Sequence, residues 1–526
     1  MKIIVTEKLA EAGVEVLRQA GDIDVDLRVD IPRDELLKII DGYDAMIVRS
    51  NTAVNEELYK KAGKLKVVGR AGNGVDNIDM QGATSRGIIV VNTPDSNSVS
   101  ACELTIALML AAARNIVRHQ DRLRKKVWSR NGLMGKELLG KTAGIIGLGR
   151  IGALVCTRLQ AFGMKVIAYD PYISDSRFAK LNAEKCAELK DLLPRADFIT
   201  IHTPKTEETI GIIGAAELAA VKEGVIIVNC ARAGLIDEAA LGAALKDGRV
   251  AAAGIDVLAG EPQAVSPLID CENITVTPHA GADTFEAQAN VGRTIAEEVL
   301  ASLRGEMVTN AVNLPNLLPN ELGRMKSYLY LCEVLGKFYH QLEKEPVEKI
   351  EIIYQGEVSD LETSLLTRAV LKGLFEPIMK ERVNYVNSTL IAQNRGIEAV
   401  ESKKVGGADL NRSVEVIVSG RSKNFSAAGT VFSRNECKIL QVNGYSLDLN
   451  PSPCMLVAMN EDKPGMIGQI GTILGVSKIN IATMQVSRDK NNNAMMVMAV
   501  DSVVPREVLN MIGGVDGIKK VSFVKL

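Results

Sequence analysis

Short apolar runs alternate with charged, helix-like stretches over the first hundred residues. Five runs have the length and the β-branched content of strands, and apolar residues recur at helical spacing between them. These runs are KIIV, VDLRV, AMIVRS, LKVVGRAG and GIIVVN. Alternation at this spacing predicts a parallel sheet that is covered by helices on both faces.

A second alternating unit begins near residue 98. SVSACELTIALMLAAARN predicts a helix, with Ser100 and Glu103 as a capping box. The stretch TAGIIGLGRIGALVCTRLQAFGMKVIAYDP predicts a strand, a glycine turn, a helix and another strand. The later runs DFITIH, GVIIVNCA and VAAAGIDV are apolar throughout, which is typical of strands buried on both faces. They predict a second parallel sheet that ends near NITVTPH.

The pattern changes after a long helical segment, TFEAQANVGRTIAEEVLASLRGE. The following TNAVNLPNLLPN is rich in asparagine and proline and predicts a linker. Helical and strand-like patterns then mix over residues 318–450, which predicts an α+β unit. From residue 454 onward the order is strand, helix, strand, strand, helix, strand, with RDKNNN as a hairpin turn. This order is ferredoxin-like.

Length and charge narrow the class of protein. A chain of 526 residues is too long for one hydrophobic core and predicts about three to four domains. The formal net charge of −2 and the 47% hydrophobic content exclude a basic nucleic-acid binder and a largely disordered chain. We therefore expect no nucleic-acid partner.

Cysteine usage and the apolar stretches indicate the compartment. The eight cysteines are scattered without a C-x-x-C pair, so we expect reduced thiols and no metal site. The N-terminus has no signal-peptide pattern, and the most apolar stretch, at 104–113, is too short to span a bilayer. The prediction is a soluble cytoplasmic protein without a membrane partner.

The stretch GLGRIG has the spacing of a dinucleotide-binding turn. Its glycines follow an apolar run and open a helix, and the next strand ends in Asp170. A terminal carboxylate of this kind binds ribose hydroxyls and repels a 2′-phosphate, which favours NAD over NADP. The alternative is a glycine turn that binds nothing. The predicted cofactor-binding residues are Gly147, Gly149, Arg150, Ile151, Gly152, Asp170 and Asp256.

Three strand ends supply the side chains that a dehydrogenase needs. His279 can take a proton near neutral pH, and a carboxylate such as Glu261 can orient it and stabilise its cation. Arg232 can bind a substrate carboxylate through two parallel hydrogen bonds. The carboxyl ends of parallel strands share one crevice, so these side chains are expected to meet. Taken singly, each is more simply a surface charge or a turn residue.

Together, and in this order after the glycine turn, the three residues resemble the D-isomer-specific 2-hydroxy acid dehydrogenase family. GRAGNGVDNID, GIIVVNTPDSNSVSACE and GKTAGIIGLGRIG are also similar to its motifs. The resemblance covers essentially the whole chain and is greatest for long members that oxidise 3-phosphoglycerate with NAD to begin serine biosynthesis. It implies that Arg232, Glu261 and His279 are the catalytic residues. The chain departs from the family pattern at Ala233 and in PHAGADT.

The resemblance also implies a fold class and a division into domains. It implies an α/β protein in which a Rossmann-type NAD-binding domain, 98–283, is inserted into a flavodoxin-like substrate-binding domain, 1–97 and 284–312. An α+β intervening domain, 318–450, and a ferredoxin-like ACT domain, 453–526, would follow. A homotetramer is implied as well.

Ligand residues outside the catalytic trio come from the same resemblance. Arg49 and Arg130 would bind the substrate phosphate, with Arg130 reaching a neighbouring subunit, and the backbone at Asn73 and Gly74 would bind the carboxylate. The alternative is that both arginines are solvated surface charges. His202 is interpreted as structural or adjacent to the cofactor.

The C-terminal DKPGMIG is similar to the ligand loop of ACT domains. The resemblance implies an effector, L-serine, bound by Asp462 and Asn480, with Asn460 as a weaker candidate. A plain dimerisation module is the alternative.

Two other functions stay open at this point. One is a different 2-hydroxy acid dehydrogenase, such as a glyoxylate or hydroxypyruvate reductase, although such enzymes usually lack the two C-terminal domains. The other is a non-enzymatic corepressor that senses NAD on the same scaffold.

Overall fold

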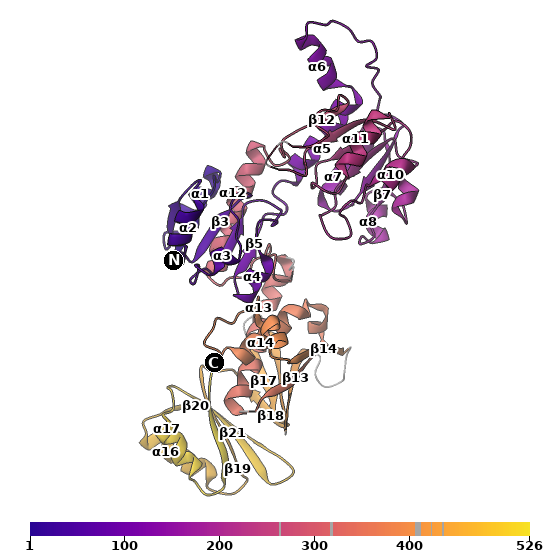
Figure 1. The fold of residues 1–526 in the computed structure, drawn as a ribbon. Helices are drawn as coiled ribbons and strands as arrows, with labels where there is room; N and C mark the ends of the chain where they lie inside the picture. The colour runs from indigo at the N-terminus through magenta and orange to yellow at the C-terminus, as the bar shows by residue number, and fades with distance from the viewer. Residues whose placement is uncertain are drawn as a thin grey trace.

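The chain forms four sheets in the part that the computed structural model describes, which is residues 1–526 except 262, 264, 316–318, 344, 405–411, 422 and 434–435. The four sheet-containing units are arranged along an elongated molecule (Figure 1). The unit from the start of the chain lies between the inserted second unit on one side and the two C-terminal units on the other.

The first sheet is parallel throughout and has the order β2-β1-β3-β4-β5, which is flavodoxin-like. Each of the five predicted runs overlaps one of these strands. The elements are β1 Lys2–Val5, α1 Glu11–Gln19, β2 Asp24–Leu27, α2 Arg33–Ile39, η1 Ile40–Gly42, β3 Ala45–Val48, α3 Glu56–Tyr59, β4 Val67–Arg70, α4 Met80–Ser85 and β5 Ile89–Val91.

A helix from far along the chain completes this first unit. Helix α12, Phe285–Leu303, crosses α1 so closely that a Cβ on Gly13 would lie 2.4 Å from the carbonyl oxygen of Gly292. Its Val291, Ile295 and Val299 belong to the same core as the strands. The second unit is therefore inserted into the first, as the expected fold class requires.

The inserted unit has a seven-stranded parallel sheet with the order β12-β11-β10-β9-β6-β7-β8. This is the Rossmann order, with the topological switch point between β6 and β9. Its elements are α5 Ser98–Ala113, α6 Ile116–Arg124, β6 Thr142–Ile146, α7 Arg150–Ala161, β7 Lys165–Tyr169, α8 Asp175–Lys180, β8 Glu184–Lys185, α9 Leu189–Leu192, β9 Phe198–Ile201, α10 Ala215–Ala220, β10 Val225–Asn229, α11 Glu238–Lys246, β11 Val250–Ile255 and β12 Ile274–Val276.

The predicted capping box of helix α5 is wrong. The helix begins at Ser98 with Asn97 as its N-cap, so Ser100 lies inside the first turn and is buried. No side chain caps the helix at Asn97. The chain enters α5 directly from the crossover between the two sheets, and this tertiary path sets its first residue.

The third unit is a mixed sheet covered by two long helices. The strand order is β14-β13-β15-β16-β17-β18, with β13 and β14 parallel and the other pairs antiparallel. Helices α13 and α14 touch at Gly336 and Gly373, where a Cβ on either would lie 2.1 Å from the other helix's backbone. The elements are α13 Pro319–Leu342, β13 Val347–Gly356, η2 Glu357–Asp360, α14 Thr363–Phe375, α15 Ser388–Asn394, β14 Glu398–Lys404, β15 Arg412–Gly420, β16 Asn424–Ser433, β17 Glu436–Val442 and β18 Tyr445–Leu449.

The fourth unit has the predicted βαββαβ order and an antiparallel sheet, β20-β21-β19-β22. RDKNNN forms the connection between β20 and β21, as expected. The elements are β19 Cys454–Glu461, α16 Met466–Val476, β20 Ile481–Arg488, β21 Asn493–Val500, α17 Arg506–Gly513 and β22 Ile518–Lys525.

The third and fourth units share one hydrophobic core. Met455, Val457 and Val497, on the sheet face away from α16 and α17, belong to the core of the third unit. The edges are tied as well, because the Gln341 side chain bonds both the N–H and the carbonyl of Lys525 on β22, at 2.8 and 3.1 Å. On β20, Gln485 makes the equivalent pair with the backbone of Asp448. The two units are distinct in topology but pack as one body.

The predicted linker is partly ordered on the first sheet. Ala311 forms an antiparallel bridge with Val91 of β5, and the side chain of Asn313 bonds the N–H of Val90 and the carbonyl of Ile88. Residues 316–318 of the same segment lie outside the described residues.

All eight cysteines have free thiols. In the described parts of the chain, no single helix is long and apolar enough to cross a membrane, and only α5 and α6, bent by 62° at their junction, reach that length and composition as a pair.

Candidate active site

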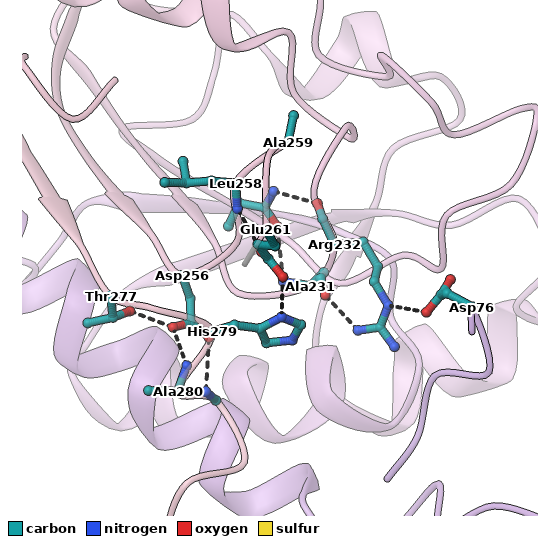
Figure 2. A network of polar contacts seen from close by, with 12 residues as sticks. Asp76, Ala231, Arg232, Asp256, Leu258, Ala259, Glu261, Thr277, His279 and Ala280 are labelled. Carbon is teal, nitrogen blue, oxygen red and sulfur yellow. Dashed lines mark hydrogen bonds and ion pairs between the residues drawn. The ribbon is translucent and has the colours of Figure 1, made fainter. Parts of the chain in front are cut away.

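The predicted catalytic residues meet at the carboxyl edge of the Rossmann sheet (Figure 2). Nδ1 of His279 lies 2.7 Å from Oε2 of Glu261, and the other carboxylate oxygen of Glu261 accepts the N–H of Leu258 at 2.8 Å. A carboxylate only accepts hydrogen bonds, so this contact assigns the proton to Nδ1 and leaves Nε2 as the free acceptor. Both side chains are partly exposed, at 49% and 36%, and so are open to a ligand.

A buried carboxylate fixes the loop that carries His279. Asp256 directly follows β11 and is 1% exposed, and its two oxygens accept from the Thr277 hydroxyl and the N–H groups of Ala280 and Gly281, at 2.5, 2.8 and 2.9 Å. Burial raises the pKa of Asp256, and the three hydrogen bonds oppose that rise. His279 itself has a left-handed φ of 55° and donates its N–H to the carbonyl of Asp256. In this structure Asp256 thus holds the histidine loop.

Arg232 lies against the first unit. It follows β10, and its carbonyl accepts a bond from the Asn229 side chain at 2.9 Å, which fixes the turn. Its Nε lies 3.8 Å from Oδ2 of Asp76, which belongs to the first unit (Figure 2). A Cβ on Gly74 would lie 2.7 Å from Nη2 of Arg232, so the loop backbone and this guanidinium are in close contact. Arg232, Asp76 and Gly74 mark the place where the two units face each other, which we call the cleft.

The glycine turn has the close contacts that a dinucleotide requires. Gly147 has a φ of 90°, and a Cβ there would meet the carbonyl of His202 at 2.8 Å. A Cβ on Gly152 would lie 2.1 Å from the carbonyl oxygen of Gly147, so this glycine allows α7 to pack on the turn. Gly149 has open space at its Cβ position, where a pyrophosphate can approach the N-terminus of α7.

Asp170 and Arg150 flank this turn. Asp170 accepts the N–H of Leu148 at 2.8 Å and that of Tyr172 at 3.0 Å, so its carboxylate is held at the end of β7 beside the turn. Arg150 begins α7, and its Nε pairs with Oδ1 of Asp95 at 2.6 Å. Asp95 lies in the crossover from the first sheet to α5, so this ion pair joins the crossover to the glycine turn.

On the substrate side, Arg49 stands on a loop that a buried glutamate anchors. Glu7, just after β1, accepts the N–H groups of Arg49, Asn51 and Thr52 at 2.8–3.2 Å. Glu7 is not among the residues predicted from the sequence. A charged residue two positions past the end of a buried strand was the signal that could have identified it.

Arg70 is a second residue that the sequence analysis did not select. It ends β4, and its guanidinium wraps around Gly72, whose φ is 144°. Its Nε is buried without a hydrogen-bond partner among the described residues. Burial lowers the pKa of Arg70 to about 10, and the neighbouring charges of Arg232 and Arg49 add to this. The guanidinium groups of Arg49 and Arg70 in the first unit and of Arg232 in the second are therefore close enough to repel one another.

The remaining predicted substrate-binding residues lie in two different parts of the molecule. Asn73 and Gly74 lie on the loop beside Arg232. Arg130 is exposed in the segment after α6, which projects away from the rest of the molecule (Figure 1). The structure does not bring Arg130 to the site of its own chain.

The predicted effector residues are engaged with their own neighbours. Oδ2 of Asp462 lies 3.1 Å from Nε of Arg488, and the side chain of Asn480 donates to Asp501 at 2.7 Å. Asn460 is 2% exposed, and its Oδ1 has no partner in the described part of the chain.

His202 lies behind the glycine turn rather than in the cleft. Burial lowers its pKa to about 4, so its imidazole is neutral near pH 7. Its Nε2 lies 3.0 Å from the hydroxyl of Thr200. These contacts agree with a structural place for His202.

Comparison with known proteins identifies the family. A family model described as the NAD binding domain of D-isomer specific 2-hydroxyacid dehydrogenases matches residues 106–281, and one described as the D-3-phosphoglycerate dehydrogenase intervening domain matches 324–443. The D-3-phosphoglycerate dehydrogenase of Methanocaldococcus jannaschii is 43% identical over 531 residues, 100% of each chain. That of Bacillus subtilis is 38% identical and aligns with 100% of this chain and 99% of its own. The chain belongs to the D-3-phosphoglycerate dehydrogenase family.

Solved structures resemble the first two units of this family member. A protein from Thermus thermophilus has a TM-score of 0.55 at 34% identity, over 59% of this chain and 100% of its own. A D-lactate dehydrogenase from Aquifex aeolicus, complexed with NAD and lactic acid, has a TM-score of 0.53 at 26% identity, over 60% of this chain and 100% of its own. The cofactor is NAD, as the glycine turn and Asp170 predicted.

The contact between Gly152 and the turn gives a test of the cofactor site. We expect Gly152→Ala to weaken NADH binding by about tenfold or more, because the added methyl must displace the carbonyl of Gly147 from the turn. Quenching or enhancement of NADH fluorescence on titration measures the affinity. Thr157→Ala, on the exposed face of the same helix, is the control. Unchanged NADH affinity in Gly152→Ala would contradict this role of the turn.

Proposed function

We propose that the chain catalyses the NAD-dependent oxidation of 3-phosphoglycerate to 3-phosphohydroxypyruvate, the first step of L-serine biosynthesis. The observation that carries this proposal is that the strand ends with the His279–Glu261 pair also bear Arg232, whose charge acts on Arg70 of the first unit together with that of Arg49. The relatives from Methanocaldococcus jannaschii and Bacillus subtilis carry that activity in their names, and the alignments extend over the whole chain.

The chemistry follows from the roles that these side chains can take. Arg232 binds the substrate carboxylate, releasing its long contact with Asp76. Nε2 of His279 accepts the hydroxyl proton as the C2–H bond breaks and the carbonyl forms. NAD, held at the glycine turn and Asp170, would supply the acceptor for the hydride that leaves C2. The carboxylate of Glu261, 2.7 Å from Nδ1, stabilises the imidazolium that results.

The charge of the substrate favours a phosphorylated acid. A 3-phosphoglycerate molecule carries a carboxylate and a phosphate, and one arginine cannot neutralise both. Arg49 stands on the loop held by Glu7 and is the candidate for the phosphate, with Arg70 beneath it. The backbone of Asn73 and Gly74 binds the carboxylate together with Arg232.

A reductase for unphosphorylated acids is the nearest rival. A glyoxylate reductase from Paecilomyes thermophila has a TM-score of 0.55 at 28% identity, and the match covers 98% of its chain but only 59% of this one. The two C-terminal units have no counterpart in that match. A corepressor is disfavoured because the proton acceptor and its carboxylate partner are both present.

We further propose that the projecting segment around α6 binds a second copy of this chain and delivers Arg130 to the partner's cleft. Trp128 is 92% exposed and Met134 is 94% exposed on this segment, with Leu123 also exposed on α6. Large apolar side chains gathered on one projection are typical of an association surface. A homotetramer would add a second interface at the fourth unit.

The fourth unit is proposed to be an ACT domain that binds L-serine. Asp462 lies in the loop before α16, where it can bind the ligand ammonium once Arg488 releases it. Arg488 is 72% exposed, and an exposed ion pair of this kind is worth only about 0–1 kcal/mol, so the exchange costs little. Asn480 can bind the same ligand from a partner chain. Serine as the pathway product would then act as a feedback inhibitor.

The compartment is proposed to be the cytoplasm. Eight free thiols in one chain suit a reducing environment.

The primary test measures NADH formation with 3-phosphoglycerate and with D-glycerate. We expect turnover with the phosphorylated acid and a loss of about a thousandfold in kcat for His279→Gln, because the proton acceptor is gone. Arg49→Met should lower kcat/KM for 3-phosphoglycerate by about tenfold to a hundredfold and change the glycerate rate little. Turnover of only the unphosphorylated acid would support the reductase instead.

Subunit exchange tests the role of Arg130. A site formed by a subunit with Arg130→Met and a partner with His279→Gln regains all its residues if Arg130 acts across the interface. We expect co-expressed mixtures to exceed the summed activities of the two separate variants. No recovery in a mixture that light scattering shows to be oligomeric would refute this arrangement. Trp128→Asp should shift the wild-type oligomer to a smaller species.

Calorimetric titration tests the effector site. We expect L-serine to bind the wild type and to lower its turnover, and Asp462→Asn to weaken serine binding by about tenfold or more, because a charge-assisted bond is lost. Asp516→Asn, which removes a fully exposed carboxylate of the same unit, is the control. Absence of serine binding to the wild type would favour a plain dimerisation module.

A further inference from the structure

The loop at residues 72–74 forms the substrate-side wall of the cleft. Gly74 lies so close to Arg232 that an added Cβ would be 2.7 Å from Nη2. The guanidinium of Arg70 packs directly against Gly72. A small displacement of this loop therefore changes its separation from two of the three guanidinium groups.

Asn92 and Thr93, which follow β5, hold the loop in place. Nδ2 of Asn92 donates to the carbonyl of Asn73 at 2.6 Å, and the N–H of Thr93 donates to the carbonyl of Gly72 at 3.1 Å. The Asn92 contact is made by a side chain, so a substitution can remove it without altering the backbone pairing of Thr93.

The same asparagine is joined to the segment that leads to the C-terminal units. Its N–H donates to the carbonyl of Asn310 at 3.1 Å. The side chain of Asn310 donates to Glu298 of α12 at 2.9 Å, and Thr309 donates to the same carboxylate at 3.1 Å. Two hydrogen bonds, both donated by Asn92, thus join the 72–74 loop to this segment. One is accepted by the carbonyl of Asn73 and the other by the carbonyl of Asn310.

We propose that Asn92 is a positioning residue that fixes the 72–74 loop for substrate binding and connects it to the segment 309–313. The inference rests on the proposed function, since it concerns the binding of the same hydroxy acid. Asn92 does not take part in the chemistry. It sets the position at which the N–H groups of the loop meet the substrate carboxylate.

Asn92→Ala tests this role through the separation of KM and kcat. We expect KM for the hydroxy acid to rise about tenfold while kcat and the NADH affinity stay near the wild-type values, because loop positioning affects binding before and during reaction alike. The melting temperature is measured beside them. Thr93 still holds the backbone at Gly72, so the variant is expected to fold.

Asn313→Ala is the matched control. Asn313 lies on the edge of β5 that also bonds Asn310, and its side chain bonds Val90, Ile88 and Thr84. The substitution removes these bonds, none of which involves the 72–74 loop. The KM of Asn313→Ala should rise clearly less than that of Asn92→Ala, because the Asn92 side chain still bonds the carbonyl of Asn73. An unchanged KM in Asn92→Ala, or an equal rise in both variants, would overturn the proposal.

The acid that the wild type oxidises is used for these measurements. Failure of the proposed substrate is then seen in the wild type, whereas failure of the Asn92 inference is seen only in the variants.

Discussion

Burial of the Arg70 guanidinium beside Arg232 and Arg49 is the constraint on which the cleft depends. Burial and the charges of Arg232 and Arg49 lower the pKa of Arg70 to about 10. The charged form of this guanidinium is therefore less stable here than it is in water. Asp76 and the buried Glu7 offset part of this charge, and Glu7 is occupied with backbone N–H groups. A ligand with two anionic groups relieves the repulsion, which is the physical basis for preferring a phosphorylated hydroxy acid over its unphosphorylated analogue.

How much of the site could be predicted depends on how directly each residue's chemistry follows from its place in a strand or turn. The glycine turn and His279 stand out because their types are rare or spaced in a known way, and both follow strands. Arg70 lies inside the motif GRAGNGVDNID. An arginine at a strand end is nevertheless interpreted as a surface charge unless the fold is known to place Gly72 against it. Glu7 was missed for the same reason. Arg130 needs a second chain, and a single sequence contains no information on that contact.

The C-terminal half shows a different limit of prediction. The βαββαβ order of the fourth unit was predicted from its pattern, whereas the common core of the third and fourth units was not predicted. A signal was present, because the runs CMLVAMN and AMMVMAV are apolar on both faces, as in a sheet buried on both sides. The ferredoxin-like order explains only one buried face, with α16 and α17. The second apolar face therefore required another packing partner within the chain.

Strand β5 of the first unit is connected both to the nucleotide-binding unit and to the segment that leads to the C-terminal units. Its carboxyl end leads through Asn92 into the crossover to the nucleotide-binding unit, where Asp95 pairs with Arg150 of the glycine turn. Its free edge accepts the segment 310–313, which leads to the C-terminal body. Because the third and fourth units share one core, the segment 310–313 joins the first sheet to a single C-terminal body. On the first sheet this segment lies within two hydrogen bonds of the 72–74 loop.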